Sequence, residues 1–200
     1  MNFKLLLKRV LKYFLLPVVS LAVLWVSYFK VYGNFHKVDD DLYRSAQLYS
    51  FNMPYYIEKY GIKSVLNLRG DSRKQWYRDE LDISKAYGVT HYDYGIGDRR
   101  MSTMKEMEDI VQIMKEAPKP LLVHCKAGAD RTSLASALYL YEIKKGEEAD
   151  KAISIIYGHF PWLGSRTVAM DKSFEKYKKN NPRQIGRAHV ELQSRGHLVC

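Results

Sequence analysis

The sequence is poor in cysteine, and this scarcity limits what can hold the chain together. Of the 200 residues only Cys125 and Cys200 are cysteines, so a disulfide framework is excluded. Hydrophobic residues make up 46% of the composition, which is enough for a core formed by apolar burial. A chain of this length allows one domain with an appended segment.

A continuous basic stripe interleaved with aromatic residues is also missing. The net charge is +10, but several of the lysines lie before residue 38 and the other cations are scattered. The sequence therefore gives no sign of a nucleic-acid partner. An excess of positive charge suits anionic partners instead, either phosphorylated substrates or anionic lipid.

One long run without charge lies near the N-terminus. Residues 13–29 carry no charged side chain, and Lys12 and Lys30 flank them. The run is near the lower limit for a helix that crosses a bilayer, and the basic residues ahead of it favour a cytoplasmic N-terminus. A cleavable signal peptide is the alternative, but no small-residue cleavage site follows. We expect a basic stub and a transmembrane helix over residues 1–30 and a linker over residues 31–41.

Strands and helices alternate through the following part of the chain. The expected strands are 42–47, 62–68, 89–94 and 120–123, and the expected helices are 52–60, 76–87, 103–114, 134–141, 147–157 and 168–178. This alternation predicts an α/β domain over residues 42–180, with a central, mainly parallel sheet flanked by helices. Ligands of such sheets bind beyond the carboxyl ends of the strands, and both Arg69 and Cys125 follow predicted strands.

The last residues, 185–200, have no clear periodicity and follow a polar stretch at residues 178–182. They resemble the translation of a sequencing adapter, so we leave them out of the expected fold as an artefact. We therefore do not interpret His189, His197 and Cys200 as a metal site. We expect neither a metal nor a cofactor.

The most informative stretch, residues 123–133, has the sequence VHCKAGADRTS. Cys125 stands where a predicted strand ends, and Arg131 stands where a predicted helix begins. Small residues between them let backbone N–H groups turn inward as a nest for an anion, and the helix N-terminus adds partial positive charge. A phosphate monoester fits this nest, with Arg131 binding two of its oxygens. The same field favours a nucleophilic thiolate at Cys125.

The pattern Cys-x5-Arg-Thr preceded by His resembles the signature of the cysteine-dependent protein tyrosine phosphatases. With LYRSAQ at 42–47, NLRG at 67–70 and YGHFP at 157–161, the chain resembles the compact dual-specificity-like phosphatases of bacteria over about residues 38–180. Together with the N-terminal run, this resemblance implies a single-pass protein of the bacterial inner membrane with a periplasmic catalytic domain. Ser133 departs from the pattern, because these enzymes usually have glycine there.

The resemblance implies a reaction in which Cys125 attacks phosphorus and forms a phosphocysteine intermediate. The loop amides and Arg131 bind the equatorial oxygens, Thr132 hydrogen-bonds the sulfur as it leaves, and His124 orders the loop. The expected substrate-binding residues are Lys126, Ala127, Gly128, Ala129, Asp130, Arg131 and, after another strand, Arg69. Arg99 and Arg100 are further candidates for a second phosphate or an acidic flank.

The leaving group needs a proton, which phosphatases of this kind take from an aspartate on a mobile loop. Asp98, on the loop after the predicted strand 89–94, is the preferred general acid. Asp130, inside the signature, is the second candidate, and Asp93, within the strand, is the third. Each of them can also be an ordinary loop or surface carboxylate.

The sequence thus predicts a membrane-anchored phosphomonoester hydrolase acting on a phosphorylated protein, small molecule or lipid. One alternative is a pseudophosphatase that binds phosphorylated ligands without turnover. A phosphoinositide or inositol phosphate phosphatase is another, since Lys126 resembles a lysine that such enzymes carry after the cysteine. Sulfur transfer by a rhodanese-like loop finds no support beyond the cysteine.

Overall fold

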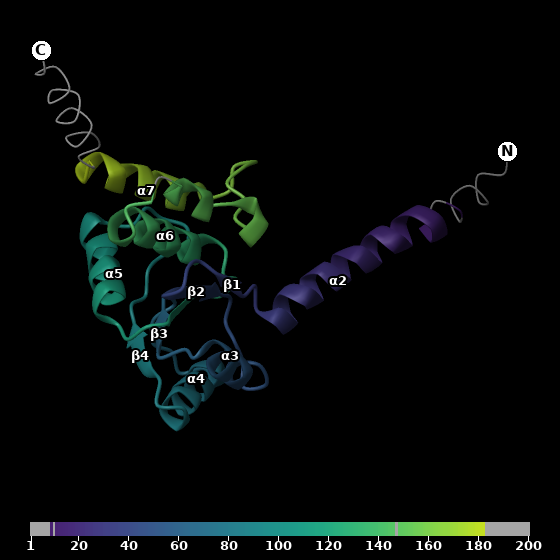
Figure 1. The fold of residues 1–200 in the computed structure, drawn as a ribbon. Coiled ribbons are helices and arrows are strands. Elements are labelled where there is room, and N and C mark those ends of the chain that lie inside the picture. Colours follow the sequence, from purple (N-terminus) through teal and green to yellow (C-terminus); the bar gives the residue numbers. More distant parts are fainter. Residues whose placement is uncertain (1–8, 10, 147, 183–200) are drawn as a thin grey trace, which may run out of the picture.

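A five-stranded sheet forms the centre of the domain in the computed structural model, which describes residues 9, 11–146 and 148–182 (Figure 1). The strands are β1 (His36–Lys37), β2 (Leu42–Ser45), β3 (Ser64–Asn67), β4 (Thr90–Asp93) and β5 (Leu121–His124). Their order is β1-β2-β5-β3-β4, and only the short β1 is antiparallel to its neighbour. The predicted α/β fold with a mainly parallel sheet is confirmed. Most of the predicted basic stub and the tail 185–200 lie outside the described residues.

Helices cover both faces of this sheet (Figure 1). On one face lie α3 (Met53–Tyr60) and α4 (Gln75–Ala86), and on the other lie α5 (Met104–Glu116), α6 (Asp130–Leu138) and α7 (Val168–Asn180). The three central strands β2, β3 and β5 are buried along their whole length. Their side chains pack into two hydrophobic cores, one on each face of the sheet, because alternate residues of a strand face opposite sides. In β5, for example, Val123 packs toward α6 and Leu122 toward α3.

The segment predicted as one helix over residues 147–157 is built differently. It contains two short 3-10 helices, η3 (Ala149–Ala152) and η4 (Ile155–Tyr157). Between them the Ser154 hydroxyl accepts the N–H of Ile156 at 3.3 Å, a local bond that competes with continuation of a helix. Ahead of η3, the π-helix η2 (Tyr139–Ile143) extends α6.

The N-terminal apolar run is helical and projects away from the domain (Figure 1). It consists of the π-helical turn η1 (Leu11–Leu15) followed by α2 (Leu16–Tyr32). Within the part of the chain that the structure describes, no helix combines the length and the apolar character needed to cross a membrane.

The interval 31–41, predicted to be a linker, is instead part of the domain. Gly33 ends α2 in the left-handed conformation with a φ of 66°, and Asn34 follows it with a φ of 46°. Both residues are buried, and β1 pairs with β2 directly afterwards. The Asn52 side chain also donates to the carbonyl of Val31 at 2.9 Å. The chain therefore enters the sheet as soon as α2 ends.

Candidate active site

The signature loop, residues 125–129, connects β5 to α6. Since β5 lies between β2 and β3, the loop emerges at the carboxyl ends of three parallel strands, the usual place for a ligand in such sheets. Cys125 begins the loop and is 3% exposed. Gly128 has a φ of 68°, and a Cβ there would lie 2.5 Å from the backbone nitrogen of Ala46. Only glycine fits this close approach.

Arg131 reaches from the first turn of α6 toward the ends of the neighbouring strands. Its Nη1 donates to the carbonyl of Leu68 at 3.1 Å, while Nη2 lies 4.0 Å from Oδ2 of Asp98. The Nε atom is buried and has no hydrogen-bond partner in the described part of the chain. The guanidinium is thus held at one corner and keeps donors for an anion at the loop.

Thr132 and Ser133, the two residues after Arg131, differ in their hydrogen-bond partners. Thr132 is fully buried, and among the described residues its hydroxyl has no hydrogen-bond partner, so it is free to bond a group at the loop. Ser133, the one departure from the expected signature, accepts a hydrogen bond from Nη2 of Arg44 at 2.7 Å. A glycine at this position would lack that bond.

Asp98 is the candidate acid that the structure brings next to Arg131. Its side chain is 51% exposed, and no hydrogen bond fixes its carboxylate to another described residue. The loop that carries it is attached where the N–H of Ile96 donates to Leu68 at 3.3 Å. The carboxylate therefore sits near the anion-binding guanidinium with freedom to move.

The other two candidate aspartates are held by neighbours. Asp93 accepts hydrogen bonds from Nδ2 of Asn67 at 2.8 Å and from the hydroxyl of Tyr77. Asp130 bonds Nδ1 of His159 at 2.7 Å. Both carboxylates are thereby fixed by other parts of the fold.

His159 joins α6 to α7 through two carboxylates. Its Nδ1 bonds Asp130, and its Nε2 bonds Asp171 at 2.9 Å. Burial opposes the charged imidazole, but the two carboxylates outweigh it and raise the pKa of His159. When protonated, the ring donates to both partners and fixes Asp130 against α7.

Sequence reasoning missed Glu80, a buried carboxylate on α4. Its Oε1 accepts hydrogen bonds from Nε2 of His124 at 3.1 Å and of His91 at 2.8 Å, and Oε2 accepts one from Gln47. Burial would raise the pKa of Glu80, but these partners lower it strongly. Glu80 thus holds the imidazole that precedes Cys125. In the sequence it is indistinguishable from any surface glutamate of a helix.

Arg69 follows β3 and is held on two sides. Its guanidinium lies 3.4 Å from the ring centroid of Trp76, and Nη1 donates to Oε1 of Gln47 at 2.7 Å. Burial and the nearby charge of Arg131 lower the pKa of Arg69, so the two guanidinium groups share one region. No ion pair to Arg69 is formed by the described residues, which leaves its charge available to a ligand.

The other cationic side chains predicted to bind substrate differ in whether they have a carboxylate partner. Lys126 is exposed at the start of the loop. Arg99 is exposed as well, whereas Arg100 is bound to Glu106 with an Nη2–Oε1 distance of 2.5 Å. The described residues contain no group of three or more histidine, cysteine or acidic side chains that could hold a metal ion.

Known proteins include a family whose sequence model matches this chain and solved structures with a similar fold. The family described as DSP-PTPase phosphatase fused to NAD+ kinase matches residues 34–181, whereas no curated protein sequence matches. The structure of PTPMT1 superposes with a TM-score of 0.56 and 18% identity, covering 74% of this chain and 98% of its own.

Two further solved structures show the same fold. TpbA of P. aeruginosa has a TM-score of 0.57 and 18% identity over 74% of this chain and 90% of its own. The core catalytic domain of the PP-IP phosphatase SIW14 from S. cerevisiae has a TM-score of 0.56 and 18% identity over 74% of this chain and 92% of its own. These likenesses extend across nearly all of each compared chain.

Proposed function

Because the chain belongs to the DSP-PTPase family of cysteine-dependent phosphatases, we propose that Cys125 is its nucleophile, Arg131 its phosphate-binding residue and Asp98 its general acid. The enzyme hydrolyses phosphate monoesters. The observation that carries the assignment is the loop at the carboxyl end of the central strand, which joins Cys125 to an arginine with an unpaired buried donor.

The reaction proceeds in two steps. The Cys125 thiolate forms a bond to phosphorus while the ester oxygen leaves with a proton from Asp98. A water molecule then gives a proton to the Asp98 carboxylate and attacks phosphorus, and the sulfur leaves as thiolate with a hydrogen bond from Thr132. The loop amides and Arg131 bind the oxygens on which charge accumulates in both steps.

Turnover of p-nitrophenyl phosphate by the full chain tests this assignment. Cys125→Ser should reduce hydrolysis to the uncatalysed background while phosphate still binds. A Cys125→Ser variant that hydrolyses p-nitrophenyl phosphate at the parent rate would overturn the assignment. A protein that binds phosphate without turnover in the parent form would indicate the pseudophosphatase alternative.

We further propose that the substrate carries a second anionic group, which Arg69 binds. Its support is a charged side chain held beside Arg131 by Trp76 and Gln47 without a carboxylate partner among the described residues. Structures of relatives contain PI(5)P in PTPMT1 and pTyr in TpbA, and SIW14 is a PP-IP phosphatase. Phosphoinositides, inositol phosphates and acidic phosphopeptides fit this requirement.

Comparison of bis-anionic and mono-anionic substrates tests the role of Arg69. Arg69→Gln should raise KM for an inositol bisphosphate or an acidic phosphotyrosine peptide by about tenfold, since a charge-assisted hydrogen bond is worth about 1.5–3 kcal/mol. KM for p-nitrophenyl phosphate should change little. An equal loss for all substrates would show that Arg69 supports the site in another way.

We also propose that the N-terminal helical segment anchors the enzyme in the bacterial inner membrane with the catalytic domain on the periplasmic side. Support comes from the exposed apolar side chains along the segment, among them Phe14, Leu16, Leu21 and Leu24, and from the basic residues ahead of it. A periplasmic reporter enzyme fused after Lys30 should be active. Activity only of a cytoplasmic reporter would overturn this topology.

A further inference from the structure

The carbonyls of the signature loop are turned outward and held there. An anion nest needs its N–H groups to point inward, so the carbonyls of the same residues must find partners elsewhere. Those of residues 126, 127 and 128 each accept a hydrogen bond from outside the loop. The donors, in that order, are the N–H of Gln47 at 3.4 Å, Nδ2 of Asn34 at 3.1 Å and Nη2 of Arg44 at 3.0 Å.

The burial, hydrogen bonds and backbone conformation of Asn34 all suit its contact with the loop. It is 2% exposed, and its Nδ2 donates to the carbonyls of both Ala127 and Tyr157, the latter at 2.9 Å. Its Oδ1 accepts from Nε2 of His36 at 2.9 Å. The amide thus uses both of its N–H groups and its oxygen. Its left-handed backbone, with a φ of 46°, is a conformation that asparagine tolerates better than most residues.

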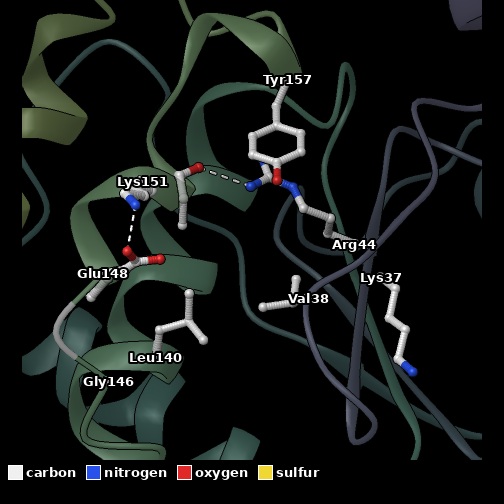
Figure 2. Close-up of a pocket in the computed structure, with 10 residues that line it drawn as sticks. Lys37, Val38, Arg44, Leu140, Gly146, Glu148, Lys151 and Tyr157 are labelled. Carbon is white, nitrogen blue, oxygen red and sulfur yellow. Dashed lines mark hydrogen bonds and ion pairs between the residues drawn. The ribbon is translucent and has the colours of Figure 1, made fainter.

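Arg44 approaches the loop from β2 on the side of the cavity shown in Figure 2. It is 1% exposed, donates from Nη1 to the carbonyl of Ala152 at 2.9 Å and lies under the ring of Tyr157, 3.9 Å from its centroid (Figure 2). Burial lowers the pKa of Arg44 to about 10, so it is charged at neutral pH. None of the described carboxylates pairs with it, and the charge of Cys125 is one of the interactions that favours its protonated form.

The position of Asn34 links this loop to the N-terminal helix. Asn34 stands one residue beyond Gly33, where α2 ends. The last turn of α2 is fixed to the start of α3, because Asn52 donates to Val31 at 2.9 Å and the Tyr56 hydroxyl donates to Tyr32 at 2.9 Å. The end of the helix and the side chain that contacts the phosphate-binding loop therefore belong to one short segment.

We propose that Asn34 and Arg44 are positioning residues of the phosphatase, which hold the signature loop in its phosphate-binding conformation from the side opposite the substrate. The proposal rests on the proposed function of Cys125 and Arg131. Loss of either side chain frees a loop carbonyl to rotate inward, where it would face the phosphate oxygens and remove an N–H donor from them.

The test uses the full chain with Asn34→Asp, which keeps size but replaces both donated hydrogens by an acceptor, and with Arg44→Lys, which lacks the planar fork whose two nitrogens reach Ala152 and Gly128. Asn52→Ala is the matched control, because it loosens the same helix end without touching the loop. The readouts are kcat/KM for p-nitrophenyl phosphate, Kd for inorganic phosphate, the pH dependence of Cys125 alkylation, and Tm.

We expect Asn34→Asp and Arg44→Lys to lower kcat/KM and phosphate affinity by about tenfold or more, since small misplacements of an oxyanion site are costly, and to move Cys125 alkylation to higher pH. Asn52→Ala should lower Tm but keep the parent values of the other readouts. Parent values in both loop variants, or an equal loss in Asn52→Ala, would overturn the proposal. If the parent lacks turnover, the proposed function fails, and the phosphate Kd values still decide this inference.

Discussion

Several side chains of the active site depend on a neighbour that fixes their orientation. Glu80 holds His124 ahead of the nucleophile, Leu68 holds one corner of Arg131, and Trp76 supports Arg69. Asp98 differs because no described residue holds its carboxylate by a hydrogen bond. A group that must give up a proton and take one back within a turnover benefits from this freedom.

The role of Asp98 can be tested by comparing the hydrolysis rates of substrates with different leaving groups. Asp98→Asn should slow hydrolysis of an alkyl phosphate by about 10²–10⁴-fold, the usual contribution of general acid catalysis. Hydrolysis of p-nitrophenyl phosphate should slow less, because nitrophenolate leaves readily without a proton. Steady-state kinetics with both substrates measures the difference.

Asp130→Asn is the comparison for that experiment. It removes the charge that His159 binds and should lower stability more than it changes the leaving-group dependence. If Asp98→Asn matches the parent on the alkyl phosphate while Asp130→Asn is inactive, the general acid is Asp130.

At the level of elements, α6 is held at its first turn by a charged contact to α7. The His159 ring bridges Asp130 of α6 and Asp171 of α7, and α6 and α7 pack together in the same core. The pKa of His159 is raised in the folded protein. Its contribution to stability is therefore complete below the unfolded pKa of about 6.5 and is lost as the pH rises through the folded value.

This linkage predicts a loss of stability in mildly alkaline solution. The free energy of unfolding in urea should fall as the pH rises above about 6.5, since deprotonated His159 can donate to only one of its two carboxylates. His159→Gln should be less stable than the parent at pH 6 and should show a smaller decrease toward pH 9. The same decrease in both proteins would exclude His159 as its source.

The elements that could be read from the sequence are those with a strong local pattern. The strands β3 and β5 carry apolar residues on both faces, and α5 begins with a capping box, in which the carboxylate of Glu106 accepts the N–H of Thr103 at 2.8 Å. The split into η3 and η4 has no such pattern. Nor has β1, whose two residues form a strand only because β2 offers them an edge.

The active site was likewise predictable only where its residues lie close together in the sequence. Spacing and small residues indicated a phosphate loop between Cys125 and Arg131, since both lie within one local segment. The contacts of Glu80, Asn34 and Arg44 join residues far apart in the chain. They depend on strand order and helix placement, which local periodicity does not contain.

For the whole molecule, the domain begins earlier than the alternation of strands indicates. The family match starts at residue 34, and Asn34 and β1 lie inside the fold. A chain starting at residue 38 should be less stable in urea than one starting at residue 31 by about 2–4 kcal/mol, since it lacks two buried hydrogen bonds of Asn34 and the β1 pairing. Equal unfolding midpoints with equal slopes would contradict this boundary.

The strand order has a consequence for how the enzyme is made. Because β5 is the last strand among the described residues yet lies between β2 and β3, a nascent polypeptide that ends at β4 leaves one edge of β2 and one edge of β3 unpaired. Such edges invite association with other chains. The sheet can therefore close only after the strand that carries the nucleophile has been made, and a product that ends before β5 lacks both the central strand and Cys125.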